Sequence, residues 1–572
     1  YPRQELPDAV KWGPDKWSID YRDKNRINCY DTGTAPCKTA CPAHIAVQGY
    51  LKLAAQGKYR EALQLIKREN PFPAVCGRIC NRRCEDACTR GTVDQAVAID
   101  EVKRFIAQQD LDAATRFVPE KVIPKVDGEF DQQIAIIGGG PAGLSCAYYL
   151  AEKGYRPTVF EKEQRLGGML ENGLPSFRLE KDVVQAEIDV LREMGVQFRC
   201  GVEVGKDVTI AQLREQGFRG FYVAVGLQSG GKLDIPGGDA QGVMAGIDFM
   251  RQVNGGQCSK LAGPVVVIGG GNIAADVART AVRCGAESVD LYCLESYDEM
   301  PMGAEDRSEC ERDGVTIHAG WGQTEVVTRD GHAAGIRFRK CLRVKDDQGR
   351  FAPVFDDNDA CEAACATVLY CIGQKVDWRQ LLTGTAVTFN PNGTAQVDPV
   401  TYQTAEPDIF AGGDAVTGQK FAIDAIAAGK EGAISLHRFV QKATLTIGRN
   451  RRQFVELDKE NALIPVGFDN TPRQRIGYNE ALRRTFRDER VAFTAEQVQK
   501  ETARCLSCGA SVVDPNKCIG CGVCTTKCAF DAIHLHRERP ECTNMIPSED
   551  KMKAILPYMV KRQIKIRKAR KK

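Results

Sequence analysis

The first part of the chain carries apolar positions at roughly helical spacing. Val47 and Leu51 lie four residues apart, and Leu63 and Ile66 lie three apart. Apolar residues separated by three or four positions share one face of a helix. Residues 1–130 are therefore predicted to be helical.

A different pattern begins at Gln133, where short apolar runs suited to buried strands alternate with longer helical segments. The run IAIIGGG follows Gln133, VVVIGGG starts at Val265, ATVLYCIG ends at Gly373, and DIFAGGDA ends near Ala415. Strands that alternate with helices are typical of a parallel α/β sheet. Residues 446–500 are rich in charge, and their pattern predicts a helical linker that wraps the body of the protein.

Composition places the chain among ordinary globular proteins with several domains. Its 572 residues are 43% hydrophobic and 27% charged, and this length corresponds to about three to five domains. The formal net charge is only +3, so no overall field attracts nucleic acid, and none is expected as a partner. No apolar run reaches the roughly 18 residues of a membrane span. No signal-peptide pattern is visible either, so we expect a cytoplasmic protein without a membrane span.

Cysteine and histidine counts narrow the chemistry. The chain has 24 cysteines, of which 14 cluster near its two ends, and only six scattered histidines. Disulfide scaffolds are typical of short secreted chains, and scattered histidines do not indicate a His-centred site. Clustered cysteines at short spacing in a long chain indicate iron–sulfur clusters.

The first glycine-rich motif follows the strand that begins near Gln133. It consists of Gly138, Gly139, Gly140, Pro141, Ala142 and Gly143. In this dinucleotide-binding pattern Gly138 allows the tight turn, Gly140 lets the backbone approach a pyrophosphate, and Gly143 lets the helix pack on the strand. The next strand, PTVFE, ends in Glu161, whose carboxylate can accept hydrogen bonds from ribose hydroxyls.

The second glycine-rich motif follows the strand that starts at Val265. It consists of Gly269, Gly270, Gly271, Asn272, Ile273 and Ala274, and the next strand ends in Glu295. Two such sites call for two dinucleotides, most economically FAD and a nicotinamide, unless the second is a vestigial fold element. Glu295 would repel a 2′-phosphate, which favours NAD(H) over NADP(H). The alternative is that Glu295 faces solvent and a later cation such as Arg307 recognises the phosphate.

The segments at 161–184 and 404–416 resemble the small-subunit family of glutamate synthase. The same module occurs in dihydropyrimidine dehydrogenase and in the large subunit of the NADH-dependent ferredoxin:NADP oxidoreductase. The resemblance implies that Val204 lies near the adenine, that Asp414 binds the ribityl chain, and that the stretch 427–430 starts a helix aimed at the flavin ring. It also implies that the FAD is lined by Glu161, Gly167, Gly168, Met169 and Arg178.

Family members that use NADPH carry an arginine pair where this chain has Leu294 and Glu295, which again favours NAD(H). Gly373 and Gly413, near the ends of two apolar runs, complete the predicted cofactor-binding set. We predict no catalytic acid or base, because hydride transfer to flavin depends on alignment rather than on a protein nucleophile.

The N-terminal cysteines are candidate iron–sulfur ligands. They are Cys29, Cys37, Cys41, Cys76, Cys80, Cys84 and Cys88. The resemblance suggests two [4Fe–4S] clusters, but Thr32 stands where the family has a further cysteine. Seven thiols cannot fill eight positions, so either a ligand other than cysteine completes one cluster or only one cluster forms.

The C-terminal cysteines include a ferredoxin-type run. They are Cys505, Cys508, Cys518, Cys521, Cys524, Cys528 and Cys542. A second C-terminal cluster would combine Cys528 with Cys505, Cys508 and Cys542. A zinc ribbon built from two CxxC pairs is the alternative, although such a four-ligand site does not need a run of three closely spaced cysteines.

Together these features predict a multidomain α/β protein with two nested Rossmann-like, three-layer ββα domains for FAD and NAD(P), between a helical iron–sulfur domain and a ferredoxin-like domain. The predicted divisions are 1–130 (helical iron–sulfur), 131–255 with 372–445 (FAD), 256–371 (inserted NAD(H)), 446–500 (linker), 501–545 (ferredoxin-like) and 546–572 (basic tail).

The expected function is that of a flavoprotein electron-transfer subunit. It would exchange hydride between NAD(H) and FAD, and single electrons through three or four [4Fe–4S] clusters with a redox subunit of a hetero-oligomeric complex or with ferredoxin. One alternative is an electron-bifurcating subunit of a hydrogenase, formate dehydrogenase or transhydrogenase complex. The other is a non-catalytic subunit that only connects clusters.

Overall fold

The computed structural model describes residues 34–121, 130–449, 456, 458–460, 468–508, 518–527, 533, 535 and 547–570. The chain divides into two compact units, Tyr1–Ser511 and Val512–Lys572, and each is treated by itself.

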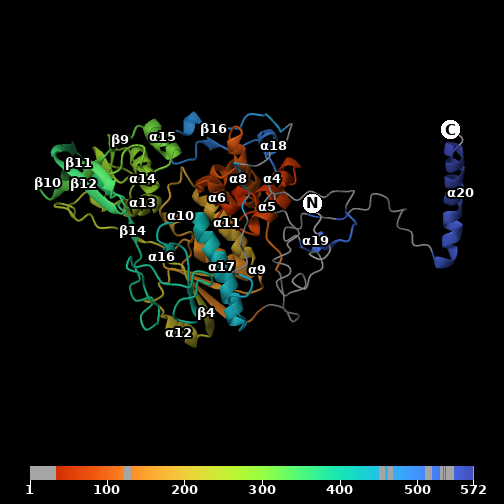
Figure 1. Ribbon diagram of the computed structural model, residues 1–572. Coiled ribbons are helices and arrows are strands. Elements are labelled where there is room, and N and C mark those ends of the chain that lie inside the picture. The colour runs from red at the N-terminus through yellow and green to blue at the C-terminus, as the bar shows by residue number, and fades with distance from the viewer. Residues whose placement is uncertain are drawn as a thin grey trace. The chain divides into compact units, whose positions relative to one another are not determined.

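The first α/β domain is built on a parallel five-stranded sheet (Figure 1). Its strands, in spatial order, are β15 (Ile409–Ala411), β4 (Phe218–Val223), β1 (Gln133–Ile137), β2 (Thr158–Glu161) and β3 (Gln197–Cys200). Its helices are α9 (Pro141–Glu152), α10 (Met169–Asn172), α11 (Lys181–Glu193), α12 (Ile210–Glu215), α16 (Asp414–Thr417) and α17 (Ala422–Val440). The central strand β1 is buried from Ile134 onward, as expected for a parallel strand covered on both faces.

Helices α9 and α17 pack closely through Gly429. A Cβ atom at Gly429 would lie 2.2 Å from the carbonyl oxygen of Ala142, so only glycine permits this approach. The crossing sets the first turn of α9 beside α17.

The second α/β domain is inserted between β4 and β15 of the first. Its parallel sheet has the order β6 (Val243–Ala245), β13 (Thr367–Tyr370), β7 (Val265–Ile268), β8 (Val289–Cys293) and β9 (Thr316–Ala319). Its helices are α13 (Gly246–Asn254), α14 (Asn272–Arg283) and α15 (Ala304–Asp313), and an antiparallel layer is formed by β10 (Trp321–Arg329), β11 (His332–Lys345) and β12 (Phe351–Ala364).

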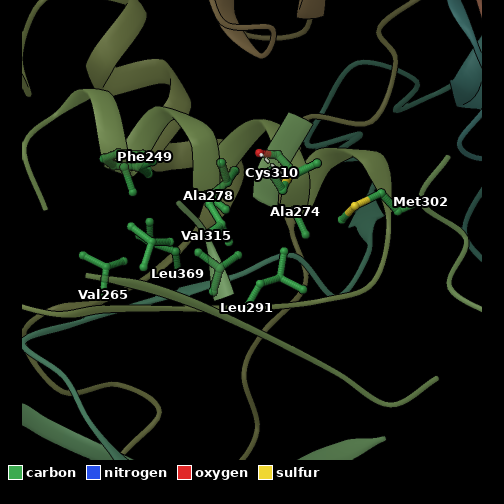
Figure 2. Close-up of a cluster of buried hydrophobic side chains, with 14 of the residues drawn as sticks. Phe249, Val265, Ala274, Ala278, Leu291, Met302, Cys310, Val315 and Leu369 are labelled. Atoms are coloured by element: carbon green, nitrogen blue, oxygen red, sulfur yellow. Dashed lines mark hydrogen bonds between the residues drawn. The ribbon is translucent and has the colours of Figure 1, made fainter. Parts of the chain in front are cut away.

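One boundary differs from the predicted division at residue 256. Strand β6 pairs with β13, Val243 opposite Val368 and Ala245 opposite Tyr370, so the second sheet takes in residues that the sequence pattern had placed in the first domain. A three-residue strand is too short to show a period of its own. Figure 2 shows the core between this sheet and its helices, where Leu291, Ala278 and Leu369 are fully buried.

The N-terminal part is helical, as predicted. It comprises α3 (Pro36–Thr39), α4 (Val47–Ala55), α5 (Tyr59–Lys67), α6 (Pro73–Ile79), α7 (Arg83–Asp86) and α8 (Ile99–Ala107). It is joined to the first α/β domain by Glu187 of α11, a fully buried carboxylate. The Glu187 oxygens accept hydrogen bonds from the backbone N–H groups of Ala74 (2.7 Å) and Val75 (2.9 Å) in the first turn of α6.

Replacement of Glu187 by alanine is expected to destabilise this junction. It would leave two buried N–H groups without acceptors, at a cost of roughly 2–5 kcal/mol in free energy of unfolding. The apparent unfolding temperature should fall by several degrees, while the exposed control Glu215→Ala should change it little. Equal unfolding temperatures for the two variants would show that this junction carries little stability.

The linker region, predicted to be helical, is mostly not helical where it is described. Residues 468–508 form a short hairpin of β16 (Gly477–Tyr478) and β17 (Arg490–Val491), a 3₁₀ turn (Glu480–Leu482) and helix α18 (Ala495–Ala503). The guanidinium of Arg490 donates to the carbonyl oxygens of Arg78 and Arg178. These side-chain bonds hold the segment against the body of the first unit.

The second unit contains α19 (Val523–Lys527) and α20 (Lys551–Arg570) in its described residues. Helix α20 holds an internal proline, Pro557, and its described side chains are almost all exposed. In the part of the chain that the structure describes, no helix is both long and apolar enough to cross a membrane.

Candidate functional site

Both glycine motifs open onto one cavity of about 980 Å³. Ligands of open parallel sheets bind at the carboxyl ends of the strands, and the cavity is lined by the loops that follow β1, β2, β7 and β8. The predicted cofactor-binding residues on its wall are Gly138, Gly140, Pro141, Ala142, Glu161, Gly168, Met169, Arg178, Val204, Gly269, Gly271, Asn272, Glu295, Gly413 and Asp414.

Four predicted residues support the cavity without lining it. Gly143 lies inside α9, where a Cβ would stand 2.0 Å from the carbonyl oxygen of Gly138, and Ala274 is fully buried inside α14. The N–H of Gly167 donates to the carbonyl oxygen of Gly139 (2.8 Å). Gly373, at φ +103°, has a conformation that favours glycine.

The loop after β1 has the geometry that its glycines predict. Gly138 has φ +108°, and a Cβ there would lie 2.4 Å from the carbonyl oxygen of Ala224. Helix α9 begins at Pro141, directly after Gly140. Its first-turn N–H groups and the positive end of its dipole therefore face the cavity, which suits a phosphate group.

Glu161, at the end of β2, is held against this loop. Its carboxylate accepts hydrogen bonds from the N–H groups of Gly139 (2.7 Å) and Glu163 (2.9 Å). Burial raises the pKa of Glu161, and these two N–H groups act in the opposite direction. The carboxylate is thus fixed in place on the cavity wall.

Glu295 occupies the corresponding place in the second domain. A carboxylate oxygen of Glu295 lies 2.8 Å from where a Cβ at Gly270 would stand, just as Glu161 lies against Gly139. Of the residues from 265 to 301 that line the cavity, none is lysine or arginine. Arg307, the alternative reader of a 2′-phosphate, stacks on the Tyr297 ring (4.9 Å to the centroid) and hydrogen-bonds the Tyr297 carbonyl.

Helix α17 presents its N-terminus to the cavity, but it begins earlier than expected. Ala422, its first residue, and Phe421 line the cavity, whereas the stretch 427–430 lies in the second and third turns. Asp424 accepts a hydrogen bond from the N–H of Phe421 (3.3 Å) and so caps this end. The local sequence does not indicate that α17 begins at Ala422, because Phe421 is not a typical capping residue.

Asp414 lies on the cavity wall at the start of α16. Burial raises the pKa of its carboxyl to about 7. The N–H of Lys420 donates to it at 3.3 Å.

Arg178 joins the two α/β domains. Its guanidinium forms ion pairs with Asp276 of α14 (2.8 Å) and Asp306 of α15 (2.9 Å). The family resemblance predicts only that Arg178 lines the FAD. A pairing between residues 98 or more positions apart leaves no local signal in the sequence. Arg178 lines the cavity and also sets the relative position of its two halves.

One group of N-terminal thiols surrounds the buried ammonium of Lys103. Burial raises the pKa of the Cys76, Cys80 and Cys84 thiols, and the nearby Lys103 charge lowers it in each case. Cys41 lies close enough to Cys80 for its charge to raise the pKa of that thiol further.

This group adjoins the dinucleotide cavity. Ile79, the residue before Cys80, lines that cavity. Arg83 of α7, next to Cys84, pairs with Asp424 in the first turn of α17 (3.1 Å).

A second group of thiols lies around a separate small cavity. It is lined by Cys37, Cys88, Cys505 and Cys508 together with mainly apolar side chains. The sequence pattern had grouped Cys505 and Cys508 with the C-terminal cysteines, but the structure places them in the first unit. Among the described residues, no three His, Cys, Asp or Glu side chains converge closely enough to hold a single metal ion.

In the second unit, Cys518, Cys521 and Cys524 are exposed on and before α19. Cys29, Cys528 and Cys542 lie outside the described residues.

Comparison with known proteins identifies three family models along the chain. The model described as pyridine nucleotide-disulphide oxidoreductase matches residues 132–429. The one described as dihydropyrimidine dehydrogenase domain II, 4Fe-4S cluster, matches residues 21–115, and a 4Fe-4S binding domain matches residues 511–534.

Individual relatives agree with these matches. The NADP(+)-dependent formate dehydrogenase subunit beta of Moorella thermoacetica is 35% identical over 504 residues. The aligned region covers 83% of this chain and 70% of the Moorella subunit. The NADPH glutamate synthase small chain of Halomonas elongata is 32% identical over 420 residues, 70% of this chain and 87% of its own. Among solved structures, Mycobacterium tuberculosis FprA in complex with NADPH aligns with a TM-score of 0.47 at 17% identity, over 54% of this chain and 85% of its own.

The predicted resemblance to the glutamate synthase small subunit is thus confirmed, as are the predicted fold class and the predicted cofactor types. The chain belongs to the pyridine nucleotide-disulphide oxidoreductase family, as an FAD- and NAD(P)-dependent iron–sulfur oxidoreductase with a 4Fe-4S domain on each side of its dinucleotide-binding region.

Proposed function

We propose that this chain is the electron-transfer subunit of a larger redox enzyme, linking NAD(H) to a partner that exchanges single electrons. The observation that supports this most strongly is the shared cavity, because both glycine loops and Ile79, next to Cys80, line it. Bound FAD supplies the chemistry that such a link needs, since flavin exchanges a hydride with a nicotinamide and single electrons with iron–sulfur clusters.

The chain's own residues contribute placement and charge. We assign the loop at Gly140 and the N-terminus of α9 to the FAD pyrophosphate, Glu161 to a ribose, and Asp414 to the ribityl chain. The N-terminus of α17 would favour negative charge on the flavin ring, because the helix dipole is positive there.

The second glycine loop is proposed to hold NAD(H) rather than NADP(H). Glu295 stands against Gly270 as Glu161 stands against Gly139, a position from which a carboxylate accepts from the ribose 2′-hydroxyl and repels a 2′-phosphate. The two relatives named above carry NADP(+) or NADPH in their names, so this chain would differ from them in specificity.

Replacement of Glu295 by arginine is expected to shift preference toward NADPH. The change removes a repulsive carboxylate and adds a phosphate-binding cation, worth about 1–2 kcal/mol or roughly 5–30-fold in the ratio of flavin-reduction rates. Stopped-flow reduction of bound flavin by each nucleotide measures that ratio. Glu295→Gln is the control, expected to weaken the preference without reversing it. A wild-type chain that already prefers NADPH would contradict this assignment.

The thiols of Cys41, Cys76, Cys80 and Cys84 are proposed to hold the [4Fe–4S] cluster nearest the flavin. Lys103, paired with Asp100, adds a buried positive charge beside them. A nearby cation favours the more negative, reduced state of a cluster and so raises its reduction potential.

Replacement of Lys103 by glutamine should lower the reduction potential of that cluster. A shift on the order of 60 mV, equivalent to tenfold in a one-electron equilibrium, is expected. A potentiometric titration followed by EPR measures it, and Lys103→Arg should restore most of the potential. An unchanged potential in the glutamine variant would place the cluster elsewhere.

A turnover assay separates this function from a non-catalytic role in connecting clusters. The purified anaerobic chain should reduce a high-potential one-electron acceptor, such as ferricyanide, with NADH as the donor. A chain that only connects clusters would show no NADH-dependent reduction. Purification from the native host, with identification of the subunits that accompany the chain, tests the proposed partner.

A further inference from the structure

The small cavity that joins Cys37 and Cys88 to Cys505 and Cys508 does not belong to the dinucleotide site. Its remaining wall is largely apolar, with Val47, Leu51, Ile99 and others. All four of these cysteines line this one cavity. Four sulfurs gathered in an apolar pocket form a donor set suited to a soft metal centre.

Cys505 and Cys508 are held at this cavity by buried charged side chains at the end of α18. Glu501 and Arg504 form an ion pair (2.7 Å), and both side chains are 0% exposed. Glu501 accepts from the N–H of Ala98 (2.7 Å). Arg504 donates to the carbonyl oxygen of Gln95 (2.6 Å).

Further bonds hold the residues around the pair. Arg90 donates to the carbonyl oxygen of Arg504 (3.0 Å), and the Gln48 amide donates to the carbonyl oxygen of Cys508. Buried ion pairs require such complete hydrogen bonding to be tolerated. The segment that carries Cys505 and Cys508 is therefore docked in a defined position.

Main-chain groups also face these sulfurs. Backbone hydrogen bonds from Val97 and Arg90 reach the Cys88 sulfur, and one from Ser507 reaches the Cys505 sulfur. Ser507 has φ +56°, an uncommon conformation for a residue with a side chain. Hydrogen bonds to sulfur are a regular feature of iron–sulfur sites, where they tune the cluster.

The arrangement favours a cluster over a single ion. Among the described residues, no three of these thiols approach closely enough for one metal ion, whereas the cysteines of a [4Fe–4S] cluster bind separate irons and stand farther apart. The first iron–sulfur family match ends at residue 115, and the second begins at residue 511. Neither match therefore includes Cys505 or Cys508.

We infer that Cys37, Cys88, Cys505 and Cys508 bind one [4Fe–4S] cluster, so that the two ends of the chain share it. This ligand set resolves the shortage of N-terminal thiols that Thr32 creates. It leaves Cys29 free of any ligand role. The inference concerns metal content, and it does not rest on the nucleotide or partner proposed above.

The test compares three variants of the full chain, purified anaerobically. Cys505→Ala/Cys508→Ala is expected to lose about four iron and four sulfide per chain, the content of one cluster, and to keep its FAD. Cys29→Ala and the non-ligand control Cys258→Ala are expected to keep full iron. Unchanged iron in the double variant, loss of iron in Cys29→Ala, or zinc in place of iron would each overturn the ligand set.

A single substitution separates ligation from mere undocking of α18. Cys505→Ser supplies an oxygen ligand in the same place, so it is expected to retain a cluster whose EPR signal is altered. If the substitution only undocked α18, the EPR signal of this cluster would be lost and the signals of the other clusters would stay unaltered. Full iron with wild-type EPR signals would show that Cys505 is not a ligand.

Discussion

Removal of residues 512–572 is expected to leave reduction of the flavin by NADH intact and to reduce electron delivery to the proposed partner strongly. These residues form a compact unit separate from the rest of the chain, and they carry the ferredoxin-type run that includes Cys518, Cys521 and Cys524. The dinucleotide cavity lies wholly in the first unit. We expect delivery to fall by roughly 100-fold, equivalent to about 2.7 kcal/mol.

The position of the cut matters for this experiment. A chain that ends at Ser511 keeps Cys505, Cys508 and the buried ion pair of Glu501 with Arg504. A chain that ends at Lys500 also loses those residues, so it should lose about four more iron than the first truncation. Delivery that survives the cut at Ser511 would show that electrons leave from another surface.

Gly140→Val is expected to weaken FAD binding, and Gly271→Val is expected to spare FAD but to weaken the binding of NADH and so slow reduction of the flavin. Both glycines have negative φ, −84° and −98°, so a side chain is not strained there. A Cβ at Gly140 would meet only Gly168, at 3.9 Å, and one at Gly271 would meet nothing within 4 Å. The added side chains therefore occupy space that the bound dinucleotides require, without disturbing the fold.

The two valine variants form a matched pair. A loss of about 3 kcal/mol, or roughly 100-fold in affinity, is expected at each site. FAD content after purification and stopped-flow reduction by NADH measure the two effects separately. If the Gly140 variant retained FAD and the Gly271 variant lost it, the assignment of the two loops would be reversed.

The features that sequence predicted well are those coded within one βαβ unit. The glycines at 138–143 and 269–274, and the acids Glu161 and Glu295, all lie within about 30 residues of one another in each domain, so strand, turn and helix signals reinforce each other locally. The structure brings both sets to one cavity wall. Their roles toward each dinucleotide stay predictions until the valine and Glu295 variants are measured.

The features that sequence missed depend on contacts between distant residues. The approach of Cys505 to Cys37 and Cys88 joins segments more than 400 residues apart, and no local pattern encodes it. The charged linker is predicted to be helical, yet its described part contains a short hairpin, whose Arg490 side chain bonds to the backbone of Arg78 and Arg178. Tertiary contacts of this kind override local propensity.

The activity proposed for the cavity is electron transfer between NADH and the iron–sulfur clusters by way of the flavin. Its most direct test is an anaerobic titration of the purified chain with NADH, followed by flavin absorbance and by EPR on the same samples. NADH is expected to bleach the flavin, and EPR signals of reduced clusters are expected to appear. A flavin that stays oxidised, or one that bleaches while every cluster remains EPR-silent even though dithionite reduces those clusters, would contradict it.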